Sequence, residues 1–250
     1  MNDAQRQALA ERLLALADDE LILGHRDSEW TGHAPILEED IAMANLAQDE
    51  LGHAAIWYGL HQELTGQDPD RLAFQRNALD YRNVQLVELP IGDWAFTMLR
   101  QYLFDAYEML LLTRLRESAY TPLAQAAAKM GNEEIYHYRH SSAWVQRLGL
   151  GTEESHQRMR RALGELWPYV EELFVPLPGD SLLIQAGVFP DLAELQEAWR
   201  QLVQPFLAQA QLPLPDVPAL PVTRQDHTEH LIDLLADMQM VARSDPEAVW

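Results

Sequence analysis

Two short motifs constrain this chain more than any other feature of its sequence. Each is a Glu-x-x-His tetrad, formed by Glu50 with His53 and by Glu134 with His137. Both lie in stretches whose apolar residues recur every three or four positions, which predicts long helices. A glutamate and a histidine three residues apart lie on one helical face, so both side chains can reach the same point in space. The sequence therefore predicts two helices that each present a carboxylate and an imidazole to the interior.

The spacing of apolar residues predicts an all-α fold. We expect helices over residues 3–25, 36–64, 93–116, 121–148, 152–173, 191–207 and 226–243. Asp93 is expected as an N-cap, and Thr121 as the next N-cap with Pro122 at the first helical position. Pro205 is expected to disturb the last turn of its helix. Residues 68–90 show no clear pattern, the prolines of 212–222 exclude a helix, and no stretch shows sustained strand alternation.

Two further helices carry an acid where the apolar pattern expects a core residue. Glu20 lies on the stripe of Leu16 and Leu23, and Asp105 interrupts the face of its own helix. Glu108, one turn away, is the alternative if that helix is rotated. A charged side chain in a core is costly unless it is paired or binds a metal. Four inward carboxylates and two imidazoles are the pattern of a dinuclear metal site in a ferritin-like four-helix bundle.

The candidate metal ligands share one property, which is that they lie on otherwise apolar helical faces. They are Glu20, Glu50, His53, Asp105, Glu134 and His137. Carboxylates completed by one imidazole per metal suit iron or manganese. A second cluster, His227 and His230 around Glu229, has no further ligand nearby, so we expect capping and surface roles for it.

Composition narrows the partners and the environment. The formal net charge is −21, so nucleic acids and anionic membranes are poor partners. The absence of cysteine excludes disulfides and thiolate metal sites and fits a cytoplasmic protein. The first residues have no apolar segment typical of a signal peptide, and no run reaches the roughly 18 apolar residues of a membrane helix.

Several short segments together resemble a known family. They are residues 28–35 (SEWTGHAP), 49–53 (DELGH), 133–137 (EEIYH), 165–169 (ELWPY) and 227–231 (HTEHL). This set resembles the A and C subunits of the bacterial multicomponent phenylacetyl-CoA epoxidase (ring 1,2-phenylacetyl-CoA epoxidase) over essentially the whole chain. The C subunit is the closer match, and its marks are the segments 28–35, 165–169 and 227–231, with Met238 and Gln239 near the end.

The resemblance implies a fold and a place in a complex. It implies a single ferritin-like domain over residues 1–250, with a bundle core at about 3–148 and a helical extension at about 152–250. It also implies a stable complex with the catalytic A subunit, which carries a di-iron site and binds the CoA thioester. Electrons from NADPH reach that complex through the flavin and iron–sulfur groups of a reductase subunit, and the C subunit is a structural partner.

The ligand pattern leaves alternatives to this structural role open. None of the six positions that match the A subunit's ligands is replaced, so the chain is a candidate to hold its own di-iron site. An independently active di-iron oxygenase or oxidase is the main alternative, and iron storage or a plain helical scaffold is a weaker one. A single lysine, Lys129, and the basic group around Arg160 give CoA binding little support.

Overall fold

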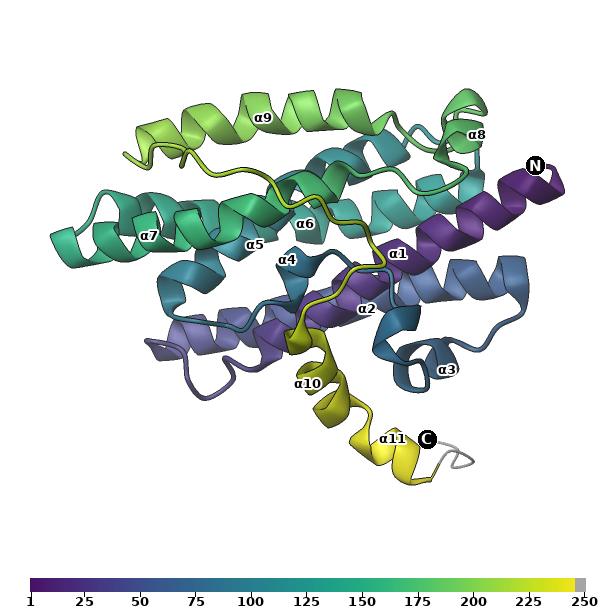
Figure 1. Ribbon diagram of the computed structural model, residues 1–250, viewed down its shortest axis with the longest axis horizontal. Coiled ribbons are helices and arrows are strands. Elements are labelled where there is room, and N and C mark those ends of the chain that lie inside the picture. The colour runs from purple at the N-terminus through teal and green to yellow at the C-terminus, as the bar shows by residue number, and fades with distance from the viewer. Residues whose placement is uncertain (246–250) are drawn as a thin grey trace. The chain divides into compact units, whose positions relative to one another are not determined.

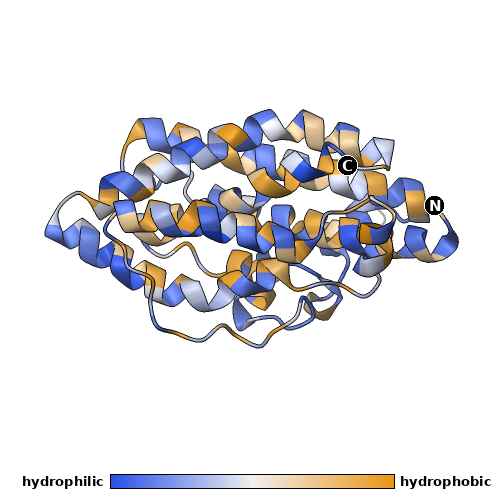
Figure 2. Cartoon of the chain, turned by 90° about the horizontal axis from the view of Figure 1, so that it is seen from above, coloured by the Kyte–Doolittle hydropathy of each residue, from blue (hydrophilic) through white to orange (hydrophobic). Residues whose placement is uncertain are grey.

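The computed structural model describes residues 1–245, and this part of the chain is all-α, without a strand, as the sequence predicts (Figure 1). Its helices divide by their contacts into two helical units. The first unit comprises residues 1–90 together with residues 222–245, and the second comprises residues 91–221. The prediction of one ferritin-like domain stays a prediction. Along the long helices hydrophobic and hydrophilic residues interleave, as expected of helices packed on one face (Figure 2).

The first unit is built on the helix pair α1 (Asp3–Ser28) and α2 (Leu37–Thr65). Asn2 starts α1 with a capping box, in which it exchanges hydrogen bonds with Gln5. Gly66, with φ of 77°, ends α2. The two helices approach closely at Gly24, where a Cβ atom would lie 3.1 Å from the Cβ of Glu50. Both helices match the predicted ranges to within a few residues.

Short elements complete the first unit where the sequence showed no clear pattern. These are α3 (Pro69–Phe74), η1 (Ala78–Asp80) and α4 (Gln85–Glu88). The predicted helix over 226–243 is instead α10 (Glu229–Met238) followed by α11 (Met240–Ser244). The predicted start was wrong because Asp226 accepts hydrogen bonds from the backbone and hydroxyl of Thr223, which forms a turn before the helix.

The second unit is built on α5 (Trp94–Leu115) and α6 (Thr121–Gly149). Asp93 caps α5 as predicted, accepting a hydrogen bond from the N–H of Phe96 at 3.0 Å. The predicted cap of α6 was wrong, because the N-cap is Tyr120 and Thr121 is already helical. Pro122 then lies in the first turn, where its missing N–H would have no helical partner in any case.

The rest of the second unit covers this pair. The range 152–173 is divided into α7 (Glu153–Leu166) and the 3₁₀ helix η2 (Trp167–Phe174). Pro168 explains the division, because proline has no N–H to continue the α-helical pattern. A short helix, α8 (Asp180–Gln185), was not predicted. The final helix, α9 (Leu192–Gln209), continues through Pro205, so the expected disturbance of its last turn is not seen.

Each unit has its own apolar core. In the first unit, Leu13 of α1 and Leu46 of α2 are fully buried. In the second, the indole of Trp199 packs in the interior and donates its N–H to the carbonyl of Leu103 at 3.1 Å. None of the helices in the described part of the chain has the length and apolar character that a membrane crossing requires. The cores therefore form from amphipathic helices, and they hold the acids described next.

Candidate metal centre

Helices α1 and α2 bring three of the predicted ligands together in the first unit. Glu20, Glu50 and His53 each offer one ligand atom, and these atoms lie within 4.8 Å of one another. The Nδ1 atom of His53 is 3.9 Å from Oε2 of Glu20 and 3.8 Å from Oε2 of Glu50. We call Glu20, Glu50 and His53 the first half-site, and none of the three is more than 3% exposed. Close helix packing beside Gly24 allows Glu50 to approach α1.

The chemistry of the first half-site fits a metal ion. Burying two carboxylates side by side is unfavourable, because each loses its hydration and each repels the other. A divalent cation held by both carboxylates and by the imidazole would offset both costs. Oxygen donors with one nitrogen donor suit iron or manganese and leave coordination positions for exchangeable ligands. This buried cluster could therefore hold a metal ion.

Helices α5 and α6 carry the other predicted ligands in the second unit. Glu134 and His137 of α6 are both fully buried, and Nδ1 of His137 lies 3.3 Å from Oε2 of Glu134. On α5 both Asp105 and Glu108 are buried, at 0% and 3% exposure. We call Glu108, Glu134 and His137 the second half-site. The sequence left Asp105 and Glu108 as alternatives, and burial does not separate them.

Asp105 is held by neutral donors on both of its carboxylate oxygens. Gln101, one turn earlier on α5, donates its Nε2 to Oδ1 at 2.8 Å. Ser141 of α6 donates its hydroxyl to Oδ2 at 2.6 Å. Asp105 thus links the two helices of the second unit. Carboxylates that bind a metal are themselves commonly hydrogen-bonded, so these bonds fit Asp105 either as a ligand or as a support, and Glu108 stays the alternative.

Two neighbours of Glu20 were not predicted to have a role. Asp18 and Asp19 directly precede it, and all three acids are buried. Asp18 forms an ion pair with Arg76 and accepts hydrogen bonds from the hydroxyl of Tyr58 at 2.5 Å and the N–H of Arg82 at 2.8 Å. Burial, together with the charge of Asp18, raises the pKa of Tyr58 well above its usual value, so the phenol stays a donor.

Asp19 is held from the other end of the sequence. Its Oδ2 accepts a hydrogen bond from Nη1 of Arg224 at 2.7 Å, and its Oδ1 accepts one from the N–H of Val84 at 2.8 Å. Burial raises the pKa of Asp19, while Arg224 and the Val84 N–H oppose that shift. The signal available in the sequence was the run of three acids, 18–20, within the otherwise apolar stretch 13–24.

The histidine cluster near the C-terminus differs in part from expectation. His227 was expected at a cap or on the surface, but its side chain is only 4% exposed. Its Nδ1 lies 2.5 Å from Oε1 of Glu88, and its Nε2 lies 3.1 Å from the carbonyl oxygen of Tyr81. His227 is therefore an internal tie within the first unit.

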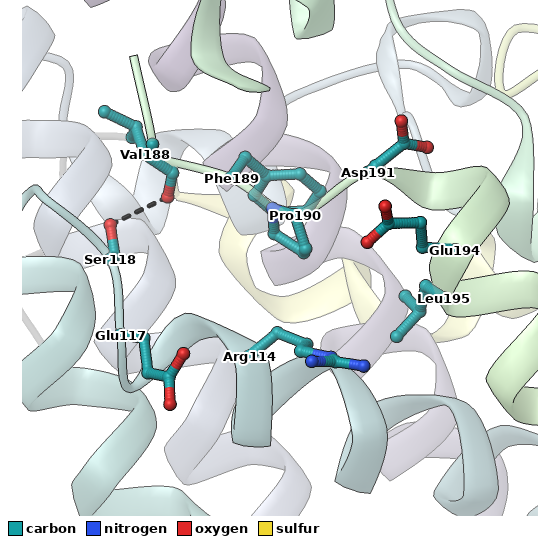
Figure 3. Close-up of a pocket in the computed structure, with 10 residues that line it drawn as sticks. Arg114, Glu117, Ser118, Val188, Phe189, Pro190, Asp191, Glu194 and Leu195 are labelled. Atoms are coloured by element: carbon teal, nitrogen blue, oxygen red, sulfur yellow. Dashed lines mark hydrogen bonds between the residues drawn. The ribbon is translucent and has the colours of Figure 1, made fainter. Parts of the chain in front are cut away.

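A surface pocket in the second unit lies beside Arg114 (Figure 3). Glu117, Asp191 and Glu194 share its wall with Arg114, and Phe189 lines it with apolar surface. Its lining includes none of the predicted metal ligands. The guanidinium of Arg114 has acidic side chains beside it in this pocket, and this arrangement does not indicate a catalytic role.

Comparison with known proteins agrees with the resemblance noted in the sequence. The family model described as "Phenylacetic acid catabolic protein" matches residues 1–250. The chain is 41% identical over 240 residues to the C subunit of the 1,2-phenylacetyl-CoA epoxidase of Escherichia coli (strain K12). That match covers 95% of this chain and 97% of the relative. The chain therefore belongs to the phenylacetic acid catabolic protein family.

Proposed function

We propose that this chain is the C-type subunit of a 1,2-phenylacetyl-CoA epoxidase and acts in phenylacetate breakdown. The observation that carries the proposal is the 41% identity to the Escherichia coli C subunit over nearly the full length of both chains. Its role is to support a catalytic A subunit by helix packing, in the cytoplasm. NADPH and the flavin and iron–sulfur groups belong to a separate reductase subunit. The negative net charge argues against nucleic-acid partners.

The proposal also includes a dinuclear metal site built from the two half-sites. We infer that its ligands are Glu20, Glu50 and His53 together with Glu108, Glu134 and His137, with Asp105 supporting the second set. The two halves are chemically alike, since each helix pair supplies one Glu-x-x-His motif and one further carboxylate. This is the donor set of ferritin-like dinuclear proteins. In this proposal Glu108 is the ligand from α5, and Asp105, whose two oxygens accept hydrogen bonds from Gln101 and Ser141, is its support.

The protein's own residues would prepare this site before any metal arrives. Gln101 and Ser141 fix the Asp105 carboxylate between α5 and α6. Burial of Glu20, Glu50 and His53 excludes water from the donors. A bound iron pair would supply the capacity to react with dioxygen, whereas in a structural subunit its charge would neutralise the buried carboxylates and join the helices.

Co-purification with the A subunit tests the structural role. The chain is expressed with a tagged A subunit from the same gene set and, separately, alone. We expect a stable complex that survives size-exclusion chromatography at about 0.5 M salt, where exposed charge pairs are largely screened. A chain that elutes alone under every condition would contradict the role as a supporting subunit.

The retained donor set favours one other function, an independently active di-iron oxygenase. Oxygen consumption separates the two proposals. The isolated chain is loaded with Fe(II) and supplied with phenylacetyl-CoA, the reductase and NADPH, in parallel with the complex. We expect oxygen uptake coupled to substrate only when the A subunit is present. Substrate-dependent uptake by the isolated chain would instead establish an enzyme.

A further inference from the structure

The C-terminal segment of the first unit is tied to α1 at two places. Arg224 donates Nη1 to Asp19 at 2.7 Å and to the carbonyl of Arg82 at 3.0 Å. Arg26 of α1 donates Nη2 to the carbonyl of His230 at 3.0 Å. Asp19 and Arg26 are seven residues apart, close to two helical turns, so they lie on the same face of α1. The segment therefore spans that face of α1 over two turns.

Helix α4 joins these two ties into one network. The carboxylate of Glu88 accepts hydrogen bonds from Nδ1 of His227 at 2.5 Å and from the N–H and hydroxyl of Thr228 at 2.7 Å each. The backbone carbonyl of Glu88 accepts from Nε and Nη2 of Arg26, at 3.0 and 2.7 Å. One buried glutamate thus connects the C-terminal segment to α1. We call the segment 224–230 the C-terminal clasp.

The clasp lies beside a proposed metal ligand. Glu20 follows Asp19 directly, and successive helical residues are about 100° apart around the axis. Fixing the carboxylate of Asp19 therefore fixes the rotation of α1 and with it the direction of Glu20. Asp18, which precedes Asp19, pairs with Arg76. Of the three acids 18–20, Glu20 is therefore the one that faces His53.

We propose that the C-terminal clasp positions Glu20 for metal binding, with Arg224 and His227 as positioning residues. The inference rests on the proposed metal-binding function of the first half-site. It gives a role to the segment 227–231, whose residues alone indicated only capping and surface positions. It also makes metal affinity depend on the far end of the chain, because Arg224 is 205 residues from Asp19.

The test compares the metal affinity of clasp variants in the full chain. Arg224→Met removes the charge at Asp19, and Arg224→Lys restores a charge with less precise geometry. Arg161→Met is the matched control, because Arg161 pairs with Asp93 in an exposed position of the second unit. Co(II) titration followed by its optical absorption, at about 15 °C, reports affinity in the folded state. We expect Arg224→Met to weaken binding about 10- to 100-fold, Arg224→Lys to weaken it less, and Arg161→Met to leave it unchanged.

Hydrogen exchange of α1 supplies a readout that does not require metal. We expect Arg224→Met to increase exchange of the amides around Glu20 in the metal-free chain, and Arg161→Met to leave them unchanged. If the unaltered chain binds no Co(II), the metal proposal fails, while the exchange result still decides whether the clasp orders α1. Unchanged exchange overturns the clasp, as does unchanged affinity in a chain that binds metal. Should Arg224→Met not fold, His227→Gln, which removes the imidazole at Glu88, gives the same two readouts.

Discussion

In the first helical unit, buried ion pairs hold the ligand-bearing helix α1. In the second unit, neutral hydrogen bonds hold the carboxylate of Asp105. Asp18 and Asp19 pair with Arg76 and Arg224, which come from distant segments of the chain. Asp105 is held by amide and hydroxyl donors of its own helix pair. The arginine pairs of Asp93 in the second unit lie at the surface instead.

The difference predicts how each unit tolerates change. Removing one partner of a buried ion pair leaves an uncompensated charge, which costs more than removing one neutral hydrogen bond. The first unit should therefore be the more sensitive to substitution around its ligands, and its ligand geometry should depend on residues remote in sequence. The second unit should tolerate the loss of single donors. The following experiments rank these effects from the largest to the smallest.

Arg76→Met should give the largest loss of stability. The buried Asp18 carboxylate keeps its hydrogen bonds from the hydroxyl of Tyr58 and the backbone N–H of Arg82. It loses the guanidinium of Arg76, with which it forms an ion pair. We expect the free energy of unfolding to fall by about 3–5 kcal/mol, measured by urea denaturation. Arg158→Met, which breaks an exposed pair with Asp93, is the control and should change little. Equal effects of the two variants would remove the contrast between the units.

Gly24→Ala should have the next largest effect, because a Cβ atom there would press on Glu50 and Leu51 at 3.1 Å. We expect a loss of about 1–3 kcal/mol in the free energy of unfolding, since two packed helices must separate. Gly52→Ala is the matched control on α2, where a Cβ would meet nothing within 4 Å. That change should stabilise the chain by up to about 1 kcal/mol through helix propensity. If both variants changed the free energy of unfolding in the same direction, the close approach of α1 and α2 at Gly24 would be contradicted.

Ser141→Ala tests the neutral network of the second unit. It removes the hydroxyl donated to Asp105 at 2.6 Å but leaves the donor from Gln101 in place. We expect a loss of about 1 kcal/mol in the free energy of unfolding. Ser142→Ala, next in the sequence, removes a longer hydrogen bond near the surface and should change stability by less than about 0.5 kcal/mol. A loss as large as that of Arg76→Met would refute the ranking.

Acid should weaken the first unit slightly through His25 and His61. Burial lowers the pKa of both imidazoles below 6.5. As the pH falls, the unfolded chain therefore binds more protons than the folded chain. The contribution of the two neutral imidazoles to the free energy of unfolding is fully present above about pH 6.5 and is lost below it. The double variant His25→Gln/His61→Gln should show a shallower decline in urea midpoint between about pH 6.5 and 5. If the urea midpoint of the double variant declined as steeply as that of the unaltered chain, groups other than His25 and His61 would cause the acid sensitivity.

Local patterns in the sequence predicted the helices that carry the ligands. The Glu-x-x-His motifs and the inward position of Glu20 follow from helical periodicity alone. Asp105 and Glu108 could not be separated, because residues three apart share a helical face and both are buried. The role of Asp19 could not be predicted either, since its partner Arg224 is brought to it only by the tertiary fold.

Anomalous diffraction from crystals of the chain reconstituted with Fe(II) or Mn(II) tests the central claim most directly. The account predicts two peaks, one in contact with Glu20, Glu50 or His53 and the other with Glu108, Glu134 or His137. Crystals soaked in the same metal that show no peak at either half-site, with metal bound only at surface carboxylates, would contradict it.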